Sequence, residues 1–268
     1  MPSFVIRSIV FYYFFFFSFL LIVIYVYKIL IYITYGLIIK LIYLFTNKNF
    51  HITTLYALNP AVLLLGLTDA HNDLIIILFL LISLRFLQNS QYTHSYFSLL
   101  TSTLIKFNTL ILLPLTFVRN QKVSFKNVFL SISLTTICLY VFFIAFQIEP
   151  QKFISNLQFI NKCLYACSPV IELNRILFKN NYLIFNYLLE FIIGIFIFHK
   201  YLLKTNQPTK FVFWISTSYL YLLVPWLAPW YLLLPITISI LIGGKYLLLN
   251  IFFTGYWFYY PLIFQIIT

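Results

Sequence analysis

The segment LTDAHNDL, at positions 67–74, places several polar side chains between two strongly apolar stretches of the chain. Asp69 and Asp73 are two of the five acidic residues in a chain of 268, and His71 and Asn72 lie between them. Two carboxylates and an imidazole so close in sequence can hold a divalent cation, and a carboxylate can also accept a proton or bind sugar hydroxyls. We therefore predict a functional site in this segment.

A simpler interpretation is that one polar residue of this segment caps the helix that follows. Thr68, Asp69 or Asn72 could supply that cap, and acidic residues are favoured near a helix N-terminus. Capping needs one such residue, whereas this segment holds several, and ionisable groups at membrane depth are rare and mostly functional. If a helix begins within residues 69–73, Asp69 and Asp73 lie four residues apart on one face of it. We favour the functional interpretation.

The composition of the whole chain places this segment in a membrane protein. Hydrophobic residues make up 63% of the sequence and charged residues 8%, whereas a soluble domain keeps roughly a quarter of its residues charged. This balance excludes an ordinary soluble globular protein. Apolar runs recur along the whole chain, so we predict an all-α polytopic membrane protein with about 8–10 transmembrane or re-entrant helices. Residues 1–268 are expected to form a single integral membrane domain.

The helices are expected in the apolar runs, which short polar segments separate. These runs cover residues 9–27, 29–46, 52–68, 73–88, 97–118, 127–147, 182–199, 211–225, 227–244 and 246–267. The run 97–118 is interrupted by Lys106, Asn108 and Pro114, which predicts two short helices that meet at a bend. Lys106 could bind a phosphate as a point charge, or its amine could reach the membrane interface.

Basic residues predict the orientation, because cytoplasmic loops are enriched in lysine and arginine. If the run 97–118 dips into the membrane and returns, one face collects Lys48, Arg85, Arg119, Lys122, Lys126, Lys200, Lys204, Lys210 and Lys245. We expect this face to be cytoplasmic, with LTDAHNDL, a loop at 148–181 and the segment VPWLAPWY outside. Four basic residues of that loop argue the other way: Lys152, Lys162, Arg175 and Lys179. The net charge of +12 is dispersed, which favours contact with anionic lipid and not with nucleic acid.

Two further features lie in the second half of the chain. Trp226, Trp230 and Tyr231 stand among the prolines of VPWLAPWYLLLP, where they could form an interfacial aromatic belt or border a pocket. Glu190 lies in the apolar run NYLLEFIIG, where an acidic side chain is either functional or paired with a basic neighbour.

Three of these segments form a familiar series: LNPAVLLLGLTDAHNDLIIILFLLISL, then SLLTSTLIKFNTLILLPL, then APWYLLLPI. The first is similar to an NP–L–G–HND block, the second to a short helix pair that carries a lysine, and the third to a Pro-Trp-Tyr segment of a distal helix. In this order they resemble bacterial mannosyltransferases of the GT-C superfamily, which use polyprenyl-phosphate-linked sugars. The resemblance covers roughly residues 40–245, and the HND block with the lysine after it is the most specific part.

The resemblance implies a GT-C-like helical bundle in the bacterial plasma membrane, with an active site that faces outside. Asn59 and Pro60 would shape the helix before the site. The residues assigned to catalysis are Asp69, His71 and Asp73, and those assigned to substrate binding are Asn72, Lys106, Trp230 and Tyr231. Among these, Lys106 is expected near the phosphate of the sugar carrier.

The implied reaction transfers a sugar, expected to be mannose, from a polyprenyl-phosphate carrier to a hydroxyl of a glycan or glycolipid acceptor. A base takes the acceptor proton, while Lys106 or a divalent cation (Mg²⁺ or Mn²⁺) stabilises the departing phosphate. Such enzymes carry an acidic residue in an outer loop after their first helix, and no acidic residue precedes Asp69 here. We therefore expect the chain to lack that N-terminal part, or another polypeptide to supply it.

Two other functions stay open. A transporter or flippase of lipid-linked saccharides would use Lys106 and Glu190 along its path, although such folds often contain internal repeats and none is found here. A non-catalytic remnant or partner subunit would agree with the absence of an acidic residue before Asp69.

Overall fold

The structure is a computed structural model that describes residues 2–119, 121–147, 149, 151, 169–178, 182–222, 229–249, 251 and 255. Most of these residues are helical. Three helical segments are long and apolar enough to cross a membrane: Phe19–Phe45, Phe125–Ala145 and Ile184–Lys204, and a bent pair over residues 50–68 is a fourth candidate. The predicted class, an all-α membrane protein, is therefore confirmed. The number of about 8–10 transmembrane or re-entrant helices stays a prediction.

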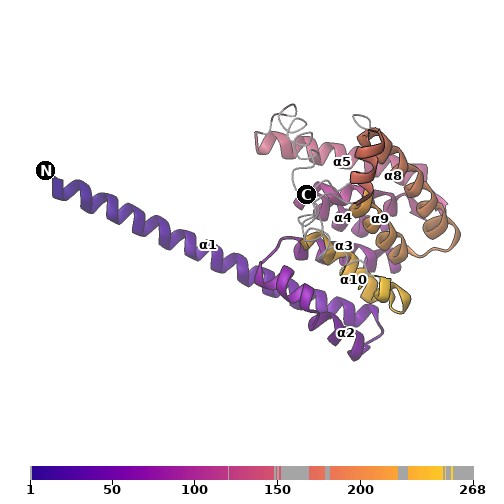
Figure 1. Cartoon of the computed structure of the whole chain (residues 1–268), viewed down its shortest axis with the longest axis horizontal. Helices are drawn as coiled ribbons and strands as arrows, with labels where there is room; N and C mark the ends of the chain where they lie inside the picture. The colour runs from indigo at the N-terminus through magenta and orange to yellow at the C-terminus, as the bar shows by residue number, and fades with distance from the viewer. Residues whose placement is uncertain are drawn as a thin grey trace.

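The longest element is α1 (Pro2–Phe45), a single helix of 44 residues, about 66 Å long at 1.5 Å per residue. The sequence analysis expected two separate runs here. That expectation is wrong, because Lys28 between the two runs is compatible with a continuous helix. One end of α1 extends far from the other helices (Figure 1). Its C-terminal half packs against them through Ile31, Ile38 and Ile42, which are buried.

A bend of 60° separates α2 (Phe50–Ala57) from η1 (Val62–Thr68), a short π-helix. Asn59 and Pro60 lie at this bend. The Asn59 side-chain oxygen accepts hydrogen bonds from the backbone N–H groups of the two residues after the proline, at 3.0 and 3.2 Å. Asn59 thereby satisfies two N–H groups that the first turn of η1 would otherwise leave unpaired.

The next two helices form an antiparallel hairpin, α3 (Asp73–Gln88) and α4 (Tyr92–Ile105). The bounds of α3 coincide with the predicted run 73–88. The chain then breaks at Lys106, whose backbone is extended (φ −153°, ψ 117°), and continues as the 3-10 helix η2 (Phe107–Thr116). The predicted bend inside 97–118 is confirmed.

A short β-hairpin, β1 (Val118–Arg119) with β2 (Lys122–Val123), joins η2 to α5 (Phe125–Ala145). Most side chains of α5 are exposed, which suits a helix that faces lipid. One side of α5 contacts α4, where Tyr96 hydrogen-bonds Thr135 at 3.2 Å.

The second half of the chain contains α7 (Pro169–Phe178), α8 (Tyr182–Phe198), η4 (His199–Lys204), α9 (Pro208–Leu222), η5 (Pro229–Leu232) and α10 (Leu233–Ile242). The segment predicted as the loop 148–181 therefore includes a helix, α7. A hydrogen bond from Asn174 to Asn186 ties α7 to α8. Residues 152–168 and Trp226 lie outside the described residues.

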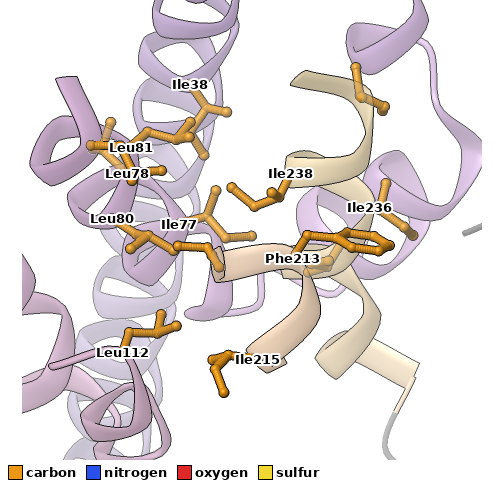
Figure 2. Packing of buried hydrophobic residues seen from close by; sticks show 14 of the residues in the cluster. Ile38, Ile77, Leu78, Leu80, Leu81, Leu112, Phe213, Ile215, Ile236 and Ile238 are labelled. Carbon is orange, nitrogen blue, oxygen red and sulfur yellow. The ribbon is translucent and has the colours of Figure 1, made fainter. Parts of the chain in front are cut away.

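The hydrophobic core lies where α1, α3, α9 and α10 meet. Figure 2 shows Ile77 of α3 facing Ile238 of α10, with Phe213 of α9 close by, and all three side chains are buried. This core fixes the N-terminal end of α3 against α9 and α10. The ends of these helices carry the residues that the sequence analysis singled out.

Candidate functional site

Asp73 and Lys106 form an ion pair that joins two separate parts of the sequence. Lys106 Nζ lies 2.8 Å from Asp73 Oδ1, and the side chains are 22% and 10% exposed for Lys106 and Asp73, respectively. Asp73 is the first residue of α3, and Lys106 occupies the break between α4 and η2. The α3–α4 hairpin brings them together, since one helix begins where its partner ends.

His71 contacts the carboxylate from the other side. The Nδ1 atom of His71 lies 3.3 Å from Asp73 Oδ2. The backbone N–H of Asp73 donates a hydrogen bond to the same Nδ1, and the two nitrogens are 3.3 Å apart. A nitrogen that accepts this hydrogen bond cannot also donate to the carboxylate. Asp73 Oδ2 is accordingly buried without a hydrogen-bond partner in the described part of the chain. One carboxylate oxygen is thus neutralised and the other is left as a potential proton acceptor.

Two aromatic residues of η5 cover this cluster. The Trp230 ring stacks on the His71 imidazole, with centroids 4.6 Å apart and planes 22° from parallel. The Tyr231 ring lies under the Lys106 ammonium, 4.2 Å from Nζ to the ring centroid, which is a cation–π contact. Trp230 and Tyr231, which the resemblance assigned to substrate binding, therefore contact His71 and Lys106 of the two earlier sequence segments.

The turn before α3 sets the direction of His71. Ala70 has a left-handed backbone (φ +49°), a conformation that costs a residue with a Cβ of order 1 kcal/mol. The N–H of His71 then bonds the carbonyl of Gly66 at 3.1 Å. At Gly66 an added Cβ would lie 3.1 Å from the Leu74 side chain, so glycine allows η1 to pack closely on α3. This packing holds the turn beside the ion pair.

A small cavity of about 60 Å³ opens beside the ion pair, between α3, η2, α9 and η5. Besides Asp73, Lys106, Trp230 and Tyr231, it is lined by polar groups of Asn108, Thr109, Ser216 and Tyr219. The sequence analysis assigned no role to these four residues. Asn108 stands two positions after Lys106, whereas nothing in the sequence distinguishes the polar residues of α9.

Two predicted site residues stand apart from this cluster. Asp69 is exposed at the end of η1 and makes no side-chain contact with the ion pair. Asn72 precedes α3 and is half-buried. The expectation that Asp69 and Asp73 share a helix face is wrong, because α3 begins only at Asp73 and the left-handed Ala70 separates them.

The capping interpretation of the segment is also wrong. Asn72 occupies the capping position of α3, and its side chain makes no capping hydrogen bond. The Thr68 hydroxyl donates backwards, to the carbonyl of Leu63 at 3.1 Å. The residues proposed for the cap therefore form no capping hydrogen bond on α3 in the described part of the chain, whereas His71 Nδ1 accepts the N–H of Asp73 at 3.3 Å and so satisfies one N–H group of its first turn.

The described residues give limited support for a divalent cation. No group of three or more His, Cys, Asp or Glu side chains is found among them that could hold a metal ion. Asp73 Oδ1 is already bound by Lys106, which leaves Asp73 Oδ2 and His71 Nδ1 as two donor atoms. A Mg²⁺ or Mn²⁺ ion needs more ligands than these two, and no step of the chemistry below passes through one.

Comparison of the sequence with models of protein families and with curated proteins gave no match, and comparison of the structure with solved structures gave none. The function is therefore argued from the geometry of the ion pair, its aromatic cover and the resemblance of the three sequence segments.

Proposed function

We propose that the protein is a membrane glycosyltransferase of the GT-C type. It would move a sugar, expected to be mannose, from a polyprenyl-phosphate carrier to a hydroxyl of an extracytoplasmic glycan or glycolipid. The observation that carries this proposal is the ion pair of Lys106 and Asp73, 2.8 Å apart and covered by two aromatic rings. The two charged residues and the two aromatic rings together come from the three segments on which the resemblance rests.

Lys106 is the group that would bind the carrier phosphate. An ammonium group is a compact positive charge, and its contact with Asp73 keeps it desolvated and ready for exchange with another anion. A phosphate oxygen that replaces Asp73 Oδ1 would be held by the same amine. The negative charge that develops on the leaving phosphate would then be stabilised at a site already shielded from bulk water.

Asp73 is the group that would take the acceptor proton. In the structure one oxygen of this carboxylate is occupied by the Lys106 ammonium. Binding of phosphate by Lys106 would release Asp73, whose second oxygen already lacks a hydrogen-bond partner in the described part of the chain. The acceptor hydroxyl would attack the anomeric carbon, its proton would pass to Asp73, and the carrier phosphate would leave toward Lys106. His71 would hold Asp73 in place through the turn.

The aromatic residues would bind the sugar and also control access. A cavity of about 60 Å³ is well below the several hundred Å³ of a usual small-molecule site. Because η5 is a single short turn, outward movement of Trp230 and Tyr231 is the change that would enlarge the cavity with least disturbance of the core. The donor's polyprenyl chain would meanwhile stay in the lipid that surrounds the apolar helices.

The proposal is tested by sugar transfer in proteoliposomes that contain the full chain. The donor is a polyprenyl-phosphate mannose with a labelled sugar, and a lipid and glycan extract serves as acceptor. The wild type is expected to transfer label, and Lys106→Met is expected to transfer about a hundredfold less or nothing. Lys122→Met is the matched control, because Lys122 is an exposed lysine of β2 remote in sequence from the cluster.

The other outcomes distinguish the alternatives. Movement of the intact lipid-linked sugar between leaflets, without transfer, would replace the proposal with a flippase. Absence of both transfer and movement in a folded wild type that still binds the donor would support a non-catalytic subunit. Equal transfer by Lys106→Met and wild type would refute the role given to the ion pair.

A further inference from the structure

A second cavity, of about 450 Å³, lies between η2, α8 and α9. Its size falls within the range of small-molecule sites, which is roughly 300–1,000 Å³. Figure 1 shows α8 and α9 side by side along this part of the protein. A Cβ at Gly194 of α8 would meet Ile215 of α9 at 3.7 Å, an ordinary van der Waals distance, so the two helices are within contact of each other here.

The cavity opens toward the lipid-facing side of α8. Phe191 and Ile195 line it and are 66% and 54% exposed. The walls on the inner side come from η2 and α9 and are apolar, including Ile111 and Phe211. A molecule that enters here would come from the hydrocarbon layer, and its apolar chain would find matching surroundings.

Glu190 is the one carboxyl residue among the described residues of this lining, which is apolar apart from Glu190 and the Tyr187 phenol. The Glu190 side chain is 5% exposed, and one oxygen, Oε1, accepts a hydrogen bond from the Ser218 hydroxyl at 3.0 Å. The other oxygen, Oε2, is buried and has no hydrogen-bond partner in the described residues. Among the residues that the structure describes, no lysine or arginine lines the cavity. A buried polar oxygen without a donor is unfavourable, so a ligand that supplies a donor is favoured at this position.

We propose that this open cavity, a groove between η2, α8 and α9, is a binding site for a lipid whose head group presents a hydroxyl. The hydroxyl would donate a hydrogen bond to Glu190 Oε2. The apolar walls would hold the chain. The hydroxyl would complete on Oε2 the contact that Ser218 already makes on Oε1. An alcohol suits the site better than an ammonium ion, because a cation loses far more favourable hydration than an alcohol when it enters apolar surroundings.

This inference does not rest on the proposed function. The groove and the cavity beside Asp73 share the wall residue Ile111, but each has its own polar group. Loss of sugar transfer would leave the groove unaffected, and an occupied groove would be compatible with any of the functions considered above.

The test uses an apolar reagent of carboxyl groups, N,N′-dicyclohexylcarbodiimide, on the full chain in lipid nanodiscs. A carboxylate oxygen bonds to the central carbon of the carbodiimide, a proton from water moves to one of its nitrogens, and the adduct rearranges to a stable N-acylurea. Mass spectrometry of the peptide that contains Glu190 measures the labelling rate. The competitors are 1-dodecanol and its methyl ether, which has the same alkyl chain but no donor.

We expect Glu190 to be labelled, and 1-dodecanol to slow the labelling about tenfold more than the ether does at the same concentration. Glu190→Gln should give no label at this position. Ser218→Ala should keep the competition, because the proposed hydroxyl uses the other oxygen of Glu190.

Two results would overturn the proposal. The first is labelling of Glu190 only after denaturation in detergent, which would mean that the groove is closed to lipid. The second is labelling in nanodiscs that the alcohol and the ether slow equally, or not at all, which would mean that Glu190 does not recognise a hydroxyl.

Discussion

Asp73 and Glu190 are both buried carboxyl residues, 7% and 5% exposed, but their surroundings differ. Asp73 lies at the start of a helix where η1, η2 and η5 converge on it, and it has a lysine at 2.8 Å and a histidine at 3.3 Å. Glu190 lies within α8, and its one hydrogen-bond partner in the described residues is the Ser218 hydroxyl of α9.

The different surroundings of Asp73 and Glu190 indicate which kind of ligand suits each carboxyl residue. Where several helix ends meet, breaks in the helices allow charged side chains to reach one another. A negative charge there can be neutralised by a positive one. Between two continuous helices only short side chains reach across, so a charge has no partner and a neutral donor suits the site better. The first region is suited to exchange of anions and the second to an uncharged lipid head group.

The largest effect is expected from Asp73→Asn. The change leaves the half-buried Lys106 ammonium without its counter-charge. The folded state should therefore lose about 3 kcal/mol of stability, which is the lower end of the range for a broken buried pair, because the lysine is partly exposed. Thermal unfolding in detergent measures this loss. The double variant Asp73→Asn with Lys106→Met should recover most of it. An unchanged melting temperature in the single variant would mean that the pair is not formed in the membrane.

Trp230→Ala should have the next largest effect. It removes the ring that stacks on His71, at a cost of about 1 kcal/mol in stability. In the transfer assay it should raise the KM for the donor more than it lowers kcat, since the ring is expected to contact the bound sugar. Trp214→Phe serves as control for loss of an indole, because the Trp214 ring packs on Phe213 and Tyr246 and does not line the cavity beside Asp73. Equal effects of both variants would contradict the sugar-binding role.

Glu190→Gln is expected to change stability by less than about 1 kcal/mol, in contrast to Asp73→Asn. The amide keeps the shape of the side chain and can still accept from Ser218, and no basic partner is lost among the described residues. The same thermal unfolding experiment compares the two isosteric changes. A loss as large as that of Asp73→Asn would show that Glu190 neutralises a cation, and the contrast between the two regions would fail.

Asp69→Asn should have the smallest effect, within about 0.5 kcal/mol in stability. Asp69 is exposed and does not contact the ion pair, so sugar transfer should stay within about threefold of the wild type, a change of less than 1 kcal/mol. The comparison of Asp69→Asn with Asp73→Asn in the transfer assay separates the two aspartates. Equal loss of transfer in both would restore the prediction that Asp69 is catalytic.

Much of the helical pattern could be predicted from the sequence, because polar residues mark the ends of apolar runs. The run 73–88 matches α3, and the break at Lys106 was predicted because a lysine, an asparagine and a proline interrupt one run. The continuous α1 was not predicted, since a single lysine can either end a membrane helix or remain inside it. The helix α7 lies in a segment that was predicted as an outer loop, because the segment is mixed in polarity.

The candidate site could be predicted only in part. Asp73 and Lys106 are conspicuous as charges in apolar runs, but their contact depends on the hairpin that pairs the start of α3 with the end of α4. Trp230 reaches His71 only through the packing of α9 and α10 on α3, which no local pattern encodes. Ser216 and Tyr219 line the cavity for the same reason, and polar residues of this kind are common on membrane helices.

The most direct test of the central claim is the affinity of the full chain for polyprenyl phosphate, measured in nanodiscs for the wild type, Lys106→Met and Asp73→Asn. If Lys106 exchanges Asp73 for phosphate, Lys106→Met should bind about tenfold or more weakly, whereas Asp73→Asn should bind as tightly as the wild type or more tightly, because no carboxylate competes for the amine. Binding by Lys106→Met that equals the wild type, or equal weakening by both variants, would contradict the claim.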